Sequence, residues 1–282
     1  MTADLCILIP EASYEDYWHP TRDDYVALFG DRVDFRCWAD AGDLSGYRLI
    51  LPLIAWGYPK KSALWFALLD EWEAAGLPFA NPIPLLRWNT DKDYLLDLQE
   101  AGLSVVPTVE SHCLTADDLA AARAQFGVSD LVIKPSISAG ADGTYRLSAH
   151  DPIPFDVLER EMLIQPMMPA VASEGEFSLF YFGGKLSHTI LKTPASGDFR
   201  VQEQFGGREV AVKAPDAARD LAVELLAAVP ARPLYARVDL VRDGDDVFRL
   251  MELEMIEPSL FLSFAGDGGA GFAKAVGDWL GG

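Results

Sequence analysis

Three carboxylates and one arginine fall on the same face of an expected β-hairpin in the C-terminal part of the chain. The segment 235–256 reads YARVDLVRDGDDVFRLMELEMI, and its Asp-Gly pair predicts a turn between two strands. Side chains alternate along a strand, so Arg237 and Asp239 share a face, as do Glu252 and Glu254 on the return strand. The turn brings these two pairs within about 5–8 Å of one another.

Crowded carboxylates of this kind predict a site for a hard divalent cation. Like charges opposite each other destabilise a sheet, and Asp and Glu are depleted in strands. One arginine does not neutralise three carboxylates, whereas two divalent cations would, and oxygen ligands suit Mg²⁺ bound to polyphosphate. The alternative is the ordinary solvated face of a half-buried sheet. The geometry favours a metal site formed by Asp239, Glu252 and Glu254.

Farther upstream, an apolar strand ends in a lysine and runs into a loop of small residues. In LVIKPSISAGADGTYRL, residues 131–147, Lys134 follows Val and Ile, where an unpaired charge is expensive. Lys134 either surfaces at the strand end or is aimed at an anion that the loop also touches. The loop lacks the G-K-[ST] ending of a Walker A motif. It leads into a strand, which excludes a Rossmann fingerprint, so a nucleotide-covering loop between antiparallel strands remains.

The composition restricts the partners of the chain. Its 282 residues carry a formal net charge of −20, and the sequence pI is about 4.4. Nucleic acid and anionic membranes reward a basic surface, so both are excluded as main partners. A phosphate ligand must therefore meet locally concentrated positive charge or metal ions.

The location of the protein is predicted from its cysteines and its apolar runs. Cys6, Cys37 and Cys113 are scattered without CxxC spacing, which indicates thiols of a reducing compartment. The first residues have no basic region typical of a signal peptide. No apolar run reaches the length of a membrane span. We therefore expect a soluble, cytoplasmic protein.

The elements expected up to about residue 85 alternate between strands and helices. Three strands are expected, at 4–10, 33–40 and 47–56. Two helices are expected, at 21–30 with Thr21 as its cap and at 60–76 with Gly76 as its stop. The second helix is amphipathic, and its apolar stripe consists of Leu64, Leu68, Leu69 and Trp72. This alternation predicts a small parallel α/β lobe.

The rest of the chain combines helices with strands that pair through tight turns. Helices are expected at 91–102, at 115–127 with Thr115 as cap, at 216–229 and at 270–280. Strands are expected at 104–110 and 130–135, and hairpins at 176–192, turning at Gly183–Gly184, and 235–256. The fold class predicted is α/β, changing to α+β in the C-terminal part.

The motifs between roughly residues 85 and 265, taken in their order along the chain, resemble those of the ATP-grasp superfamily. DKDY with Lys92 and VIKP with Lys134 resemble its two nucleotide-contacting lysines, and in EGEFSLF Glu176 stands at the position of a ribose-binding acid. LIQPMMPAV resembles the hinge whose backbone reads adenine, with contact positions Gln165, Pro166, Met167 and Met168. The loop after Lys134 would supply backbone N–H groups to the phosphates, and its nucleotide-binding residues would be Ser136, Ser138, Gly140 and Gly143.

Further segments resemble particular ligases. LKTPASGDFRVQEQFGG resembles a segment of bacterial glutathione synthetase, which maps Lys192 and Arg200 onto phosphate- or substrate-contacting positions. ARVDL resembles D-alanine–D-alanine ligase, in which the arginine contacts the phosphoryl group and the aspartate binds metal. MELEMIEP resembles the closing Glu-x-Asn metal motif, with Glu254 in place of the asparagine. This departure, a loop poorer in glycine and the segment IEPSLFL are more similar to the cycloserine-forming ligase branch.

The resemblance implies an ATP-grasp fold in which the nucleotide is held between two α+β subdomains. A pre-ATP-grasp α/β lobe would occupy residues 1–85, and a small subdomain with the lid loop residues 86–168. The C-terminal subdomain with the metal-binding hairpin would occupy residues 169–282.

The resemblance also implies an ATP-dependent carboxylate–amine ligase for a small amino-acid-like or peptide-like substrate. It would form an acyl phosphate and release ADP and phosphate, with Arg237, Arg200 and Lys192 as catalytic residues. ATP and Mg²⁺ would be the cofactors, with two ions expected and Mn²⁺ as a substitute.

Two alternatives stay open. One is an intramolecular cyclo-ligase of the cycloserine-forming type, and the other is a non-catalytic ATP-binding regulatory protein. Retention of all three carboxylates argues against the second. The substrates are expected to be a small-molecule carboxylate and a nucleophile, and whether the chain forms a homo-oligomer is left open.

Two groups of residues favour structural roles. His188 lies between Ser187 and Thr189 in an expected strand, where a satisfied structural histidine is favoured over a catalytic one. Four tryptophans are expected to build the seam between the first lobe and the rest: Trp56, Trp65, Trp72 and Trp88. Ser259 after Pro258 is left open as a substrate contact.

Overall fold

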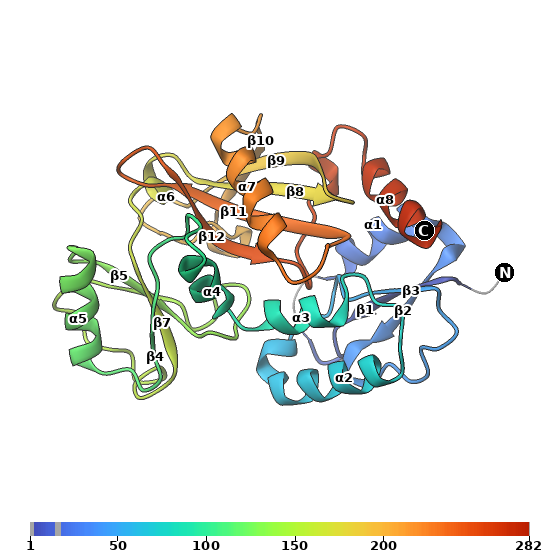
Figure 1. The fold of residues 1–282 in the computed structure, drawn as a ribbon, viewed down its shortest axis with the longest axis horizontal. Coiled ribbons are helices and arrows are strands. Elements are labelled where there is room, and N and C mark those ends of the chain that lie inside the picture. Colours follow the sequence, from blue (N-terminus) through green and yellow to red (C-terminus); the bar gives the residue numbers. More distant parts are fainter. Residues whose placement is uncertain (1–2, 15–17, 282) are drawn as a thin grey trace.

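Three β-sheets, each with its own helices, make up the protein. A computed structural model describes residues 3–14 and 18–281. Figure 1 shows the five-stranded sheet of the C-terminal part lying above two smaller sheets, one near the N-terminus and one drawn in green. The mixture of parallel and antiparallel sheets confirms the predicted fold class.

The first lobe contains a parallel sheet of order β2-β1-β3. Its strands are β1 (Leu5–Ile9), β2 (Val33–Cys37) and β3 (Leu49–Leu51), and its helices are α1 (His19–Phe29) and α2 (Ser62–Ala74). Short 3₁₀ turns occupy Gly30–Arg32, Trp38–Asp40 and Tyr58–Lys61. The parallel α/β lobe is therefore confirmed, although only residues 49–51 of the expected strand 47–56 are extended in a ladder.

Both helices of this lobe differ in detail from expectation. Thr21 is not the cap of α1, because the helix begins at His19 after Trp18, with a proline in its first turn. Proline suits that position because its missing N–H would have no partner there. In α2 the buried residues are Trp65, Leu69 and Trp72, whereas Leu64 is 39% exposed. The predicted stripe was therefore displaced by one position at its start.

Two short helices lead out of the lobe. The sequence reading missed α3 (Ile83–Thr90), which has a proline in its first turn and buries Asn89 and Thr90. It is followed by α4 (Tyr94–Glu100), which lies within the helix expected at 91–102. Trp65 of α2 donates through Nε1 to Thr90 Oγ1 at 2.9 Å, which joins the lobe to α3.

The second sheet is antiparallel, with strand order β4-β7-β5-β6. It consists of β4 (Val109–Ser111), β5 (Leu131–Lys134), β6 (Tyr145–Leu147) and β7 (Met162–Pro166), covered by α5 (Ala116–Phe126). Thr115 caps α5 in a reciprocal capping box with Asp118, as expected for the cap. The strand expected at 104–110 was mostly wrong, because Val105 bridges Leu250 of the third sheet instead.

The third sheet carries the two expected hairpins and has the order β10-β9-β8-β11-β12. Its strands are β8 (Glu176–Phe182), β9 (Lys185–Thr193), β10 (Arg208–Ala211), β11 (Tyr235–Arg242) and β12 (Phe248–Glu254). Its helices are α6 (Ala170–Ser173), α7 (Asp216–Ala228) and α8 (Ala270–Gly281), with 3₁₀ turns at Glu203–Phe205 and Leu262–Phe264. Both hairpins are confirmed.

The core joins the two ends of the chain. Tyr25 and Phe29 of α1 pack against Phe272 of α8, with ring centroids 6.2 and 6.0 Å apart. Figure 1 shows α1 and α8 side by side. The division of the chain at residues 85 and 168 remains a prediction.

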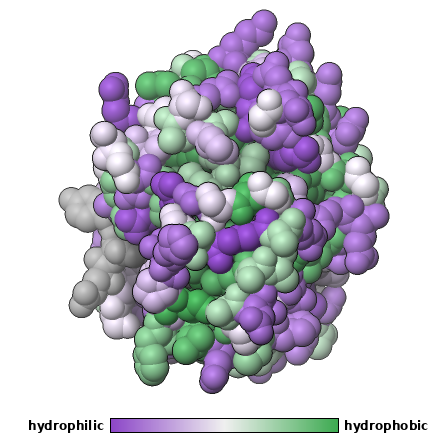
Figure 2. Space-filling view, turned by 90° about the vertical axis from the view of Figure 1, so that its left-hand side faces the viewer, coloured by the Kyte–Doolittle hydropathy of each residue, from purple (hydrophilic) through white to green (hydrophobic). Residues whose placement is uncertain are grey.

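Among the described helices, none has the length and apolar character needed to cross a bilayer. Figure 2 shows one face of the molecule with hydrophilic side chains over most of it and smaller apolar patches between them.

Candidate active site

A cavity of about 1460 Å³ is lined by residues from all three sheets and their connections. The first lobe contributes Trp56 and Tyr58, the second sheet Val132 and Gln165, and the third sheet Asp239. Ligand pockets commonly enclose about 300–1,000 Å³. The cavity therefore has room for a nucleotide and a second ligand together.

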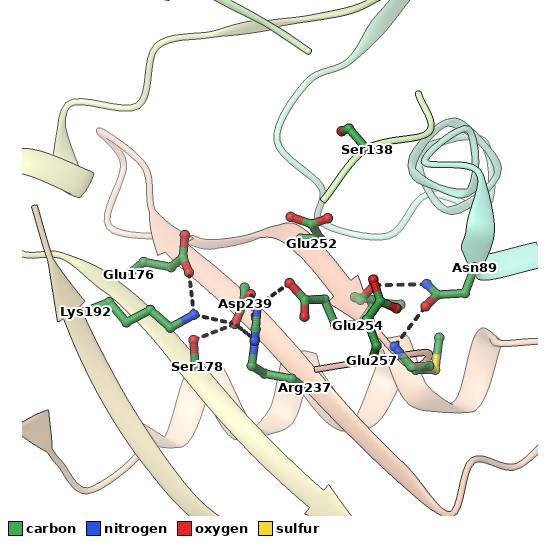
Figure 3. A network of polar contacts seen from close by, with 12 residues as sticks. Asn89, Ser138, Glu176, Ser178, Lys192, Arg237, Asp239, Glu252, Glu254 and Glu257 are labelled. Carbon is green, nitrogen blue, oxygen red and sulfur yellow. Dashed lines mark hydrogen bonds and ion pairs between the residues drawn. The ribbon is translucent and has the colours of Figure 1, made fainter. Parts of the chain in front are cut away.

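The carboxylate hairpin forms the floor of this cavity. In the antiparallel pair of β11 and β12, Asp239 lies opposite Glu252 and Arg237 opposite Glu254, which confirms the shared face and the predicted register. Arg237 Nε lies 3.1 and 3.0 Å from the two carboxylate oxygens of Asp239, and its Nη2 forms an ion pair with Glu254. Ser178 on β8 donates its hydroxyl to Asp239. Figure 3 shows these side chains pointing to the same side of the sheet.

The expectation that Arg237 faces three carboxylates alone was wrong. Lys192 Nζ lies 3.3 Å from Glu176 Oε1 and 3.7 Å from Asp239 Oδ1. Lys92 Nζ, from the residues that precede α4, lies 3.2 Å from Glu252 Oε1. Because these lysines come from other elements, hairpin periodicity could not reveal them. Crowding on the hairpin by itself therefore does not require a metal ion.

The charges on this floor are nevertheless unevenly compensated. Burial acts to raise the pKa of Asp239, but Arg237 and Lys192 hold it below its ordinary value. Burial raises the pKa of Glu254 to about 7, the charges of Glu252 and Asp239 add to this, and Arg237 opposes it. The end of the floor near Glu254 is thus short of positive charge.

Lys134 does not surface at its strand end. Its relative exposure is 8%, and it lines the cavity at the end of β5. Burial, with a smaller contribution from the charge of Lys92, lowers the pKa of Lys134 to about 8, against the influence of Glu252. A buried lysine of this kind gains most when an anionic ligand shares its environment.

The loop after Lys134 lies over the cavity and touches the third sheet's connections. Gly140 and Gly143 have φ values of 62° and 69°, and a Cβ on Gly143 would lie 2.9 Å from Pro135 Cγ. Gln204 Nε2 donates to Gly140 O at 3.0 Å. Lys92 donates to the carbonyl of Ser138, which lines the cavity. Glycine is therefore required at position 143, where the positive φ coincides with a close approach to Pro135.

Three of the predicted nucleotide contacts have hydrogen-bond partners within the protein. Ser136 lies outside the cavity lining, and its hydroxyl donates to Glu161 Oε1 at 3.2 Å. In the hinge, Gln165, Pro166, Met167 and Met168 all line the cavity. The backbone N–H of Met167 already donates to Asp130 O at 3.0 Å, and the Gln165 amide donates to Thr108 Oγ1 at 2.9 Å. Nucleotide contact by these residues remains a prediction.

Arg200 lines the cavity with its charge already paired. Its Nε and Nη2 lie 3.1 and 2.8 Å from the two oxygens of Asp198, and its guanidinium stacks on Phe205 at 3.7 Å from the ring centroid. The Arg200 side chain holds the pKa of Asp198 well below its usual range. Lys192 and Arg237 lie closer to the carboxylates of the floor than this pair does.

Sequence reasoning missed the residues that fix the backbone beyond β12. Asn89 bonds both Leu253 O and Met255 N, at 2.9 and 2.8 Å. Further side chains donate to this segment from four other parts of the chain: Tyr94 to Leu253 O, Asn81 to Met255 O, Tyr235 to Ile256 O and Trp56 to Glu257 O. A usable signal was two asparagines, buried here, in the otherwise apolar stretch FANPIPLLRWN.

Within the described residues, two other clusters bring three ligand groups within 4.8 Å of one another. One is Asp91, Asp93 and Glu161, and the other is Glu110, His112 and Glu161. The three carboxylates of the floor do not form such a cluster, and each of them is paired with a lysine or arginine. Their all-oxygen donor set still fits a hard cation.

The structural interpretation of His188 agrees with its contacts. Its ring stacks on Phe180 with centroids 4.3 Å apart, and Nε2 lies 3.1 Å from Leu260 O. Among the tryptophans, Trp88 packs against Tyr94 at 5.1 Å, while Trp56 lines the cavity as well as bonding Glu257 O. The seam therefore borders the site.

Comparison with known proteins gives one full-length relative and one partial relative. No family model matches the chain. The cycloserine biosynthesis protein DcsG of Streptomyces lavendulae is 31% identical over 285 residues, covering 94% of both chains. A glutathione synthetase of Neisseria meningitidis is 27% identical over 163 residues, which cover 53% of this chain and 49% of the synthetase.

Solved structures extend the comparison. The crystal structure of the D-cycloserine synthetase DcsG has a TM-score of 0.84 at 26% identity, covering 98% of this chain and 99% of that chain. A D-alanine–D-alanine ligase of Bacillus anthracis in complex with ATP has a TM-score of 0.70 at 18% identity, covering 98% and 95%. The second similarity concerns the fold alone.

Proposed function

The chain belongs to the ATP-grasp family of ligases, as its motifs predicted, and we propose that it activates the carboxylate of a small amino-acid-like substrate as an acyl phosphate. The substrate carboxylate oxygen attacks the γ-phosphorus of ATP, and the bond to the β-phosphate oxygen breaks to release ADP. A nitrogen or related nucleophile then attacks the acyl carbon, and phosphate leaves. Positioning and charge neutralisation supply most of the first step.

The observation that carries this proposal is the convergence of charged groups from different elements on one cavity. Lys92 and Lys134 approach from the second sheet's side, while Lys192 and Arg237 lie on the third sheet. We assign Lys134 and Lys92 to the phosphates of ATP. Lys192 and Arg237 neutralise the transferred phosphoryl group, and Arg200 assists them when a ligand displaces Asp198. Glu176, paired with Lys192, is assigned to the ribose.

We assign the divalent cations to the carboxylate floor. Asp239, Glu252 and Glu254 are the residues that would hold Mg²⁺, with two ions and Mn²⁺ as a substitute. Bound there, the ions supply charge stabilisation to the phosphates. The lysine and arginine partners of these carboxylates compensate part of the negative charge of the floor in the absence of ions.

A second candidate is ring closure within one amino acid derivative. It is favoured by the full-length similarity to a cycloserine biosynthesis protein and by the fold similarity to a D-cycloserine synthetase. In that reaction the nucleophile and the activated carboxylate belong to the same molecule. Mass spectrometry of the product distinguishes the two candidates, since only in the second do all atoms of the product come from a single substrate molecule, which loses one carboxylate oxygen with the phosphate. A cytoplasmic location, with ATP and reduced thiols, agrees with the free cysteines Cys6, Cys37 and Cys113.

The proposal is tested by ADP release and by trapping the acyl phosphate with hydroxylamine, using Glu252→Gln as the variant. We expect turnover to fall by orders of magnitude, because loss of a metal-binding carboxylate removes several kcal/mol of transition-state stabilisation. The melting temperature of the ligand-free variant should change little, because the lost ion pair with Lys92 is about 30% exposed on the Glu252 side. Stabilisation by ATP with Mg²⁺ should shrink.

The matched control is Glu224→Gln on the exposed face of α7. It makes the same chemical change far from the cavity lining and should leave turnover unaltered. Wild-type turnover by Glu252→Gln would contradict the metal assignment. Hydroxamate formation by neither wild type nor control would contradict the acyl-phosphate reaction.

A further inference from the structure

We infer that Glu257, at the first-lobe end of the cavity, binds a protonated amino group of the substrate, which makes the substrate class an α-amino acid. This inference rests on the proposed ligase function and assigns the part of the cavity that the nucleotide and metal assignments leave unused. Glu257 lines the cavity together with Trp56 and Tyr58 of the first lobe.

The position of Glu257 sets it apart from the nucleotide end of the site. Figure 3 shows Glu176 and Lys192 on one side of Asp239 and Arg237, and Glu254 and Glu257 on the other side. Glu176 is the residue assigned to the ribose. A substrate that presents its carboxylate to the phosphoryl group near Arg237 therefore extends the rest of its structure toward Glu257.

The charge environment of Glu257 differs from that of the other acids on the floor. Asp239, Glu252 and Glu254 each have a lysine or arginine within ion-pair distance. Among the described residues, no lysine or arginine lies within 4.0 Å of the Glu257 carboxylate, which bonds its own backbone N–H. Burying a carboxylate without a cationic partner is costly, so a cation supplied by a ligand is favoured there.

The ionisation of Glu257 agrees with this role. Burial, followed by the charge of Glu254, raises the pKa of Glu257 to about 8, and Lys92 opposes this shift only in part. Lys92 is already engaged by Glu252 and by the carbonyl of Ser138. An arriving ammonium group would therefore meet the one acid of the floor whose charge is not already matched by a protein side chain.

The backbone that carries Glu257 is held by hydrogen bonds from buried and half-buried side chains. Asn81 donates to Met255 O at 2.8 Å, Tyr235 to Ile256 O at 2.7 Å, and Trp56 to Glu257 O at 3.3 Å. A side chain positioned in this way loses little freedom when a ligand binds, which favours a binding role. The neighbouring aromatic rings add a surface on which a cation is stabilised.

The test compares amino acids with their counterparts that lack the α-amino group, using ADP release. The panel contains D- and L-alanine, serine and 2,3-diaminopropionate, with propionate, 3-hydroxypropionate and 3-aminopropionate as counterparts. We expect the effective amino acid to have a KM about ten- to 150-fold below that of its counterpart, the range for a hydrogen bond to a charged group.

In Glu257→Gln, the KM for the amino acid should rise by a similar factor while that for the counterpart stays unaltered. Its kcat and its affinity for a non-hydrolysable ATP analogue with Mg²⁺, measured by calorimetry, should also stay unaltered. The substitution keeps the shape of the side chain, and Glu257→Asp should restore part of the preference. Glu224→Gln serves again as the matched control.

The other outcomes overturn the inference in distinguishable ways. Equal KM values for amino acids and counterparts would remove the ammonium site and leave the ligase function standing. A fall in kcat with KM unaltered would make Glu257 a proton-transfer group instead. Loss of ATP-analogue binding would make it part of the nucleotide and metal site. If ATP binds but no acid of the panel causes ADP release, the proposed function itself is contradicted.

Discussion

Burial separates Lys134 from an ordinary lysine at a strand end. The sequence showed a lysine after an apolar run but could not show whether its ammonium group reached solvent. At 8% exposure, with Lys92 and Glu252 as charged neighbours, it does not. The same distinction applies to Glu257, whose chemistry depends on which cations are absent from its surroundings. Such three-dimensional neighbourhoods are not encoded in local sequence patterns.

We expect Lys134→Met to weaken binding of a non-hydrolysable ATP analogue by about 1.5–3 kcal/mol, the range for a hydrogen bond to a charged group. Methionine keeps most of the apolar volume of the side chain and removes its charge. Isothermal titration calorimetry at pH 7 measures the difference. An unaltered affinity would mean that Lys134 is only a buried structural residue.

The same measurement has a characteristic dependence on pH. The free protein holds Lys134 with a pKa of about 8, lowered by burial, so the charged form predominates below pH 8. Above pH 8, binding of the anion must first protonate the lysine, and the affinity of the wild type should fall by up to about tenfold per pH unit. Lys134→Met should lack this fall between pH 8 and 9.5. A parallel pH dependence in both proteins would assign it to another group.

At the scale of elements, the sequence predicted the helices and strands whose signals lie within one short stretch of the chain. Alternation along 235–256 and its Asp-Gly turn were sufficient for the register of β11 and β12, because both signals lie within the hairpin. The cap of α5 was also predictable, since Thr115 and Asp118 form a local box. Lys92 and Lys192 were placed by family resemblance, but their pairing with Glu252 and Asp239 depends on packing between elements.

Two elements were predicted wrongly, because the sequence signal of each was weak or fitted more than one structure. The short helix α3 has a proline near its start and a mixture of apolar and polar residues, so it resembled a connection. The segment 104–110 has strand composition, but Val106 donates its N–H to Leu250 O in another sheet rather than to a local partner. In both places the structure was decided by tertiary contacts, which the helix and strand propensities of the residues do not take into account.

The role of α3 in holding β12 leads to a test at this scale. Asn89→Ala removes two bonds, to Leu253 O and Met255 N, and leaves both backbone groups buried. We expect a loss of roughly 1–3 kcal/mol in the free energy of unfolding, because the Met255 N–H is left unsatisfied, whereas Leu253 O keeps its hydrogen bond from Tyr94. Urea denaturation measures this loss, and ADP release should fall because Glu254 and Glu257 follow this backbone.

Gln99→Ala is the matched control for Asn89→Ala. Gln99 makes the same pair of bonds to one backbone, that of Thr108, but from an exposed position on α4. Water can replace the lost partner there, so a smaller loss of stability and normal ADP release are expected. Equal effects of the two substitutions would show that the bonds of Asn89 have no special part in placing the floor.

At the scale of the whole molecule, the charge balance raises the question of how an anionic nucleotide reaches the site. The chain carries a formal charge of −20. The cavity lining contains seven lysines and arginines and eight aspartates and glutamates. The positive groups are therefore placed at particular points of the cavity. The lining as a whole is not positively charged, so it does not offset the negative net charge of the molecule. Local geometry, and not a general attraction, holds the phosphates.

This balance predicts that salt accelerates nucleotide association. Between about 10 and 150 mM salt the Debye length falls from roughly 30 to 8 Å, which screens the net charge from an approaching nucleotide while contacts within the cavity are screened much less. In stopped-flow measurements with a fluorescent ATP analogue and Mg²⁺, the association rate constant should therefore rise with salt. The corresponding fluorescent adenosine, which has no phosphates, should show no such rise. A rate constant that falls with salt would show that the cavity lysines steer ATP from a distance, and that the net charge of the chain has little influence on its approach.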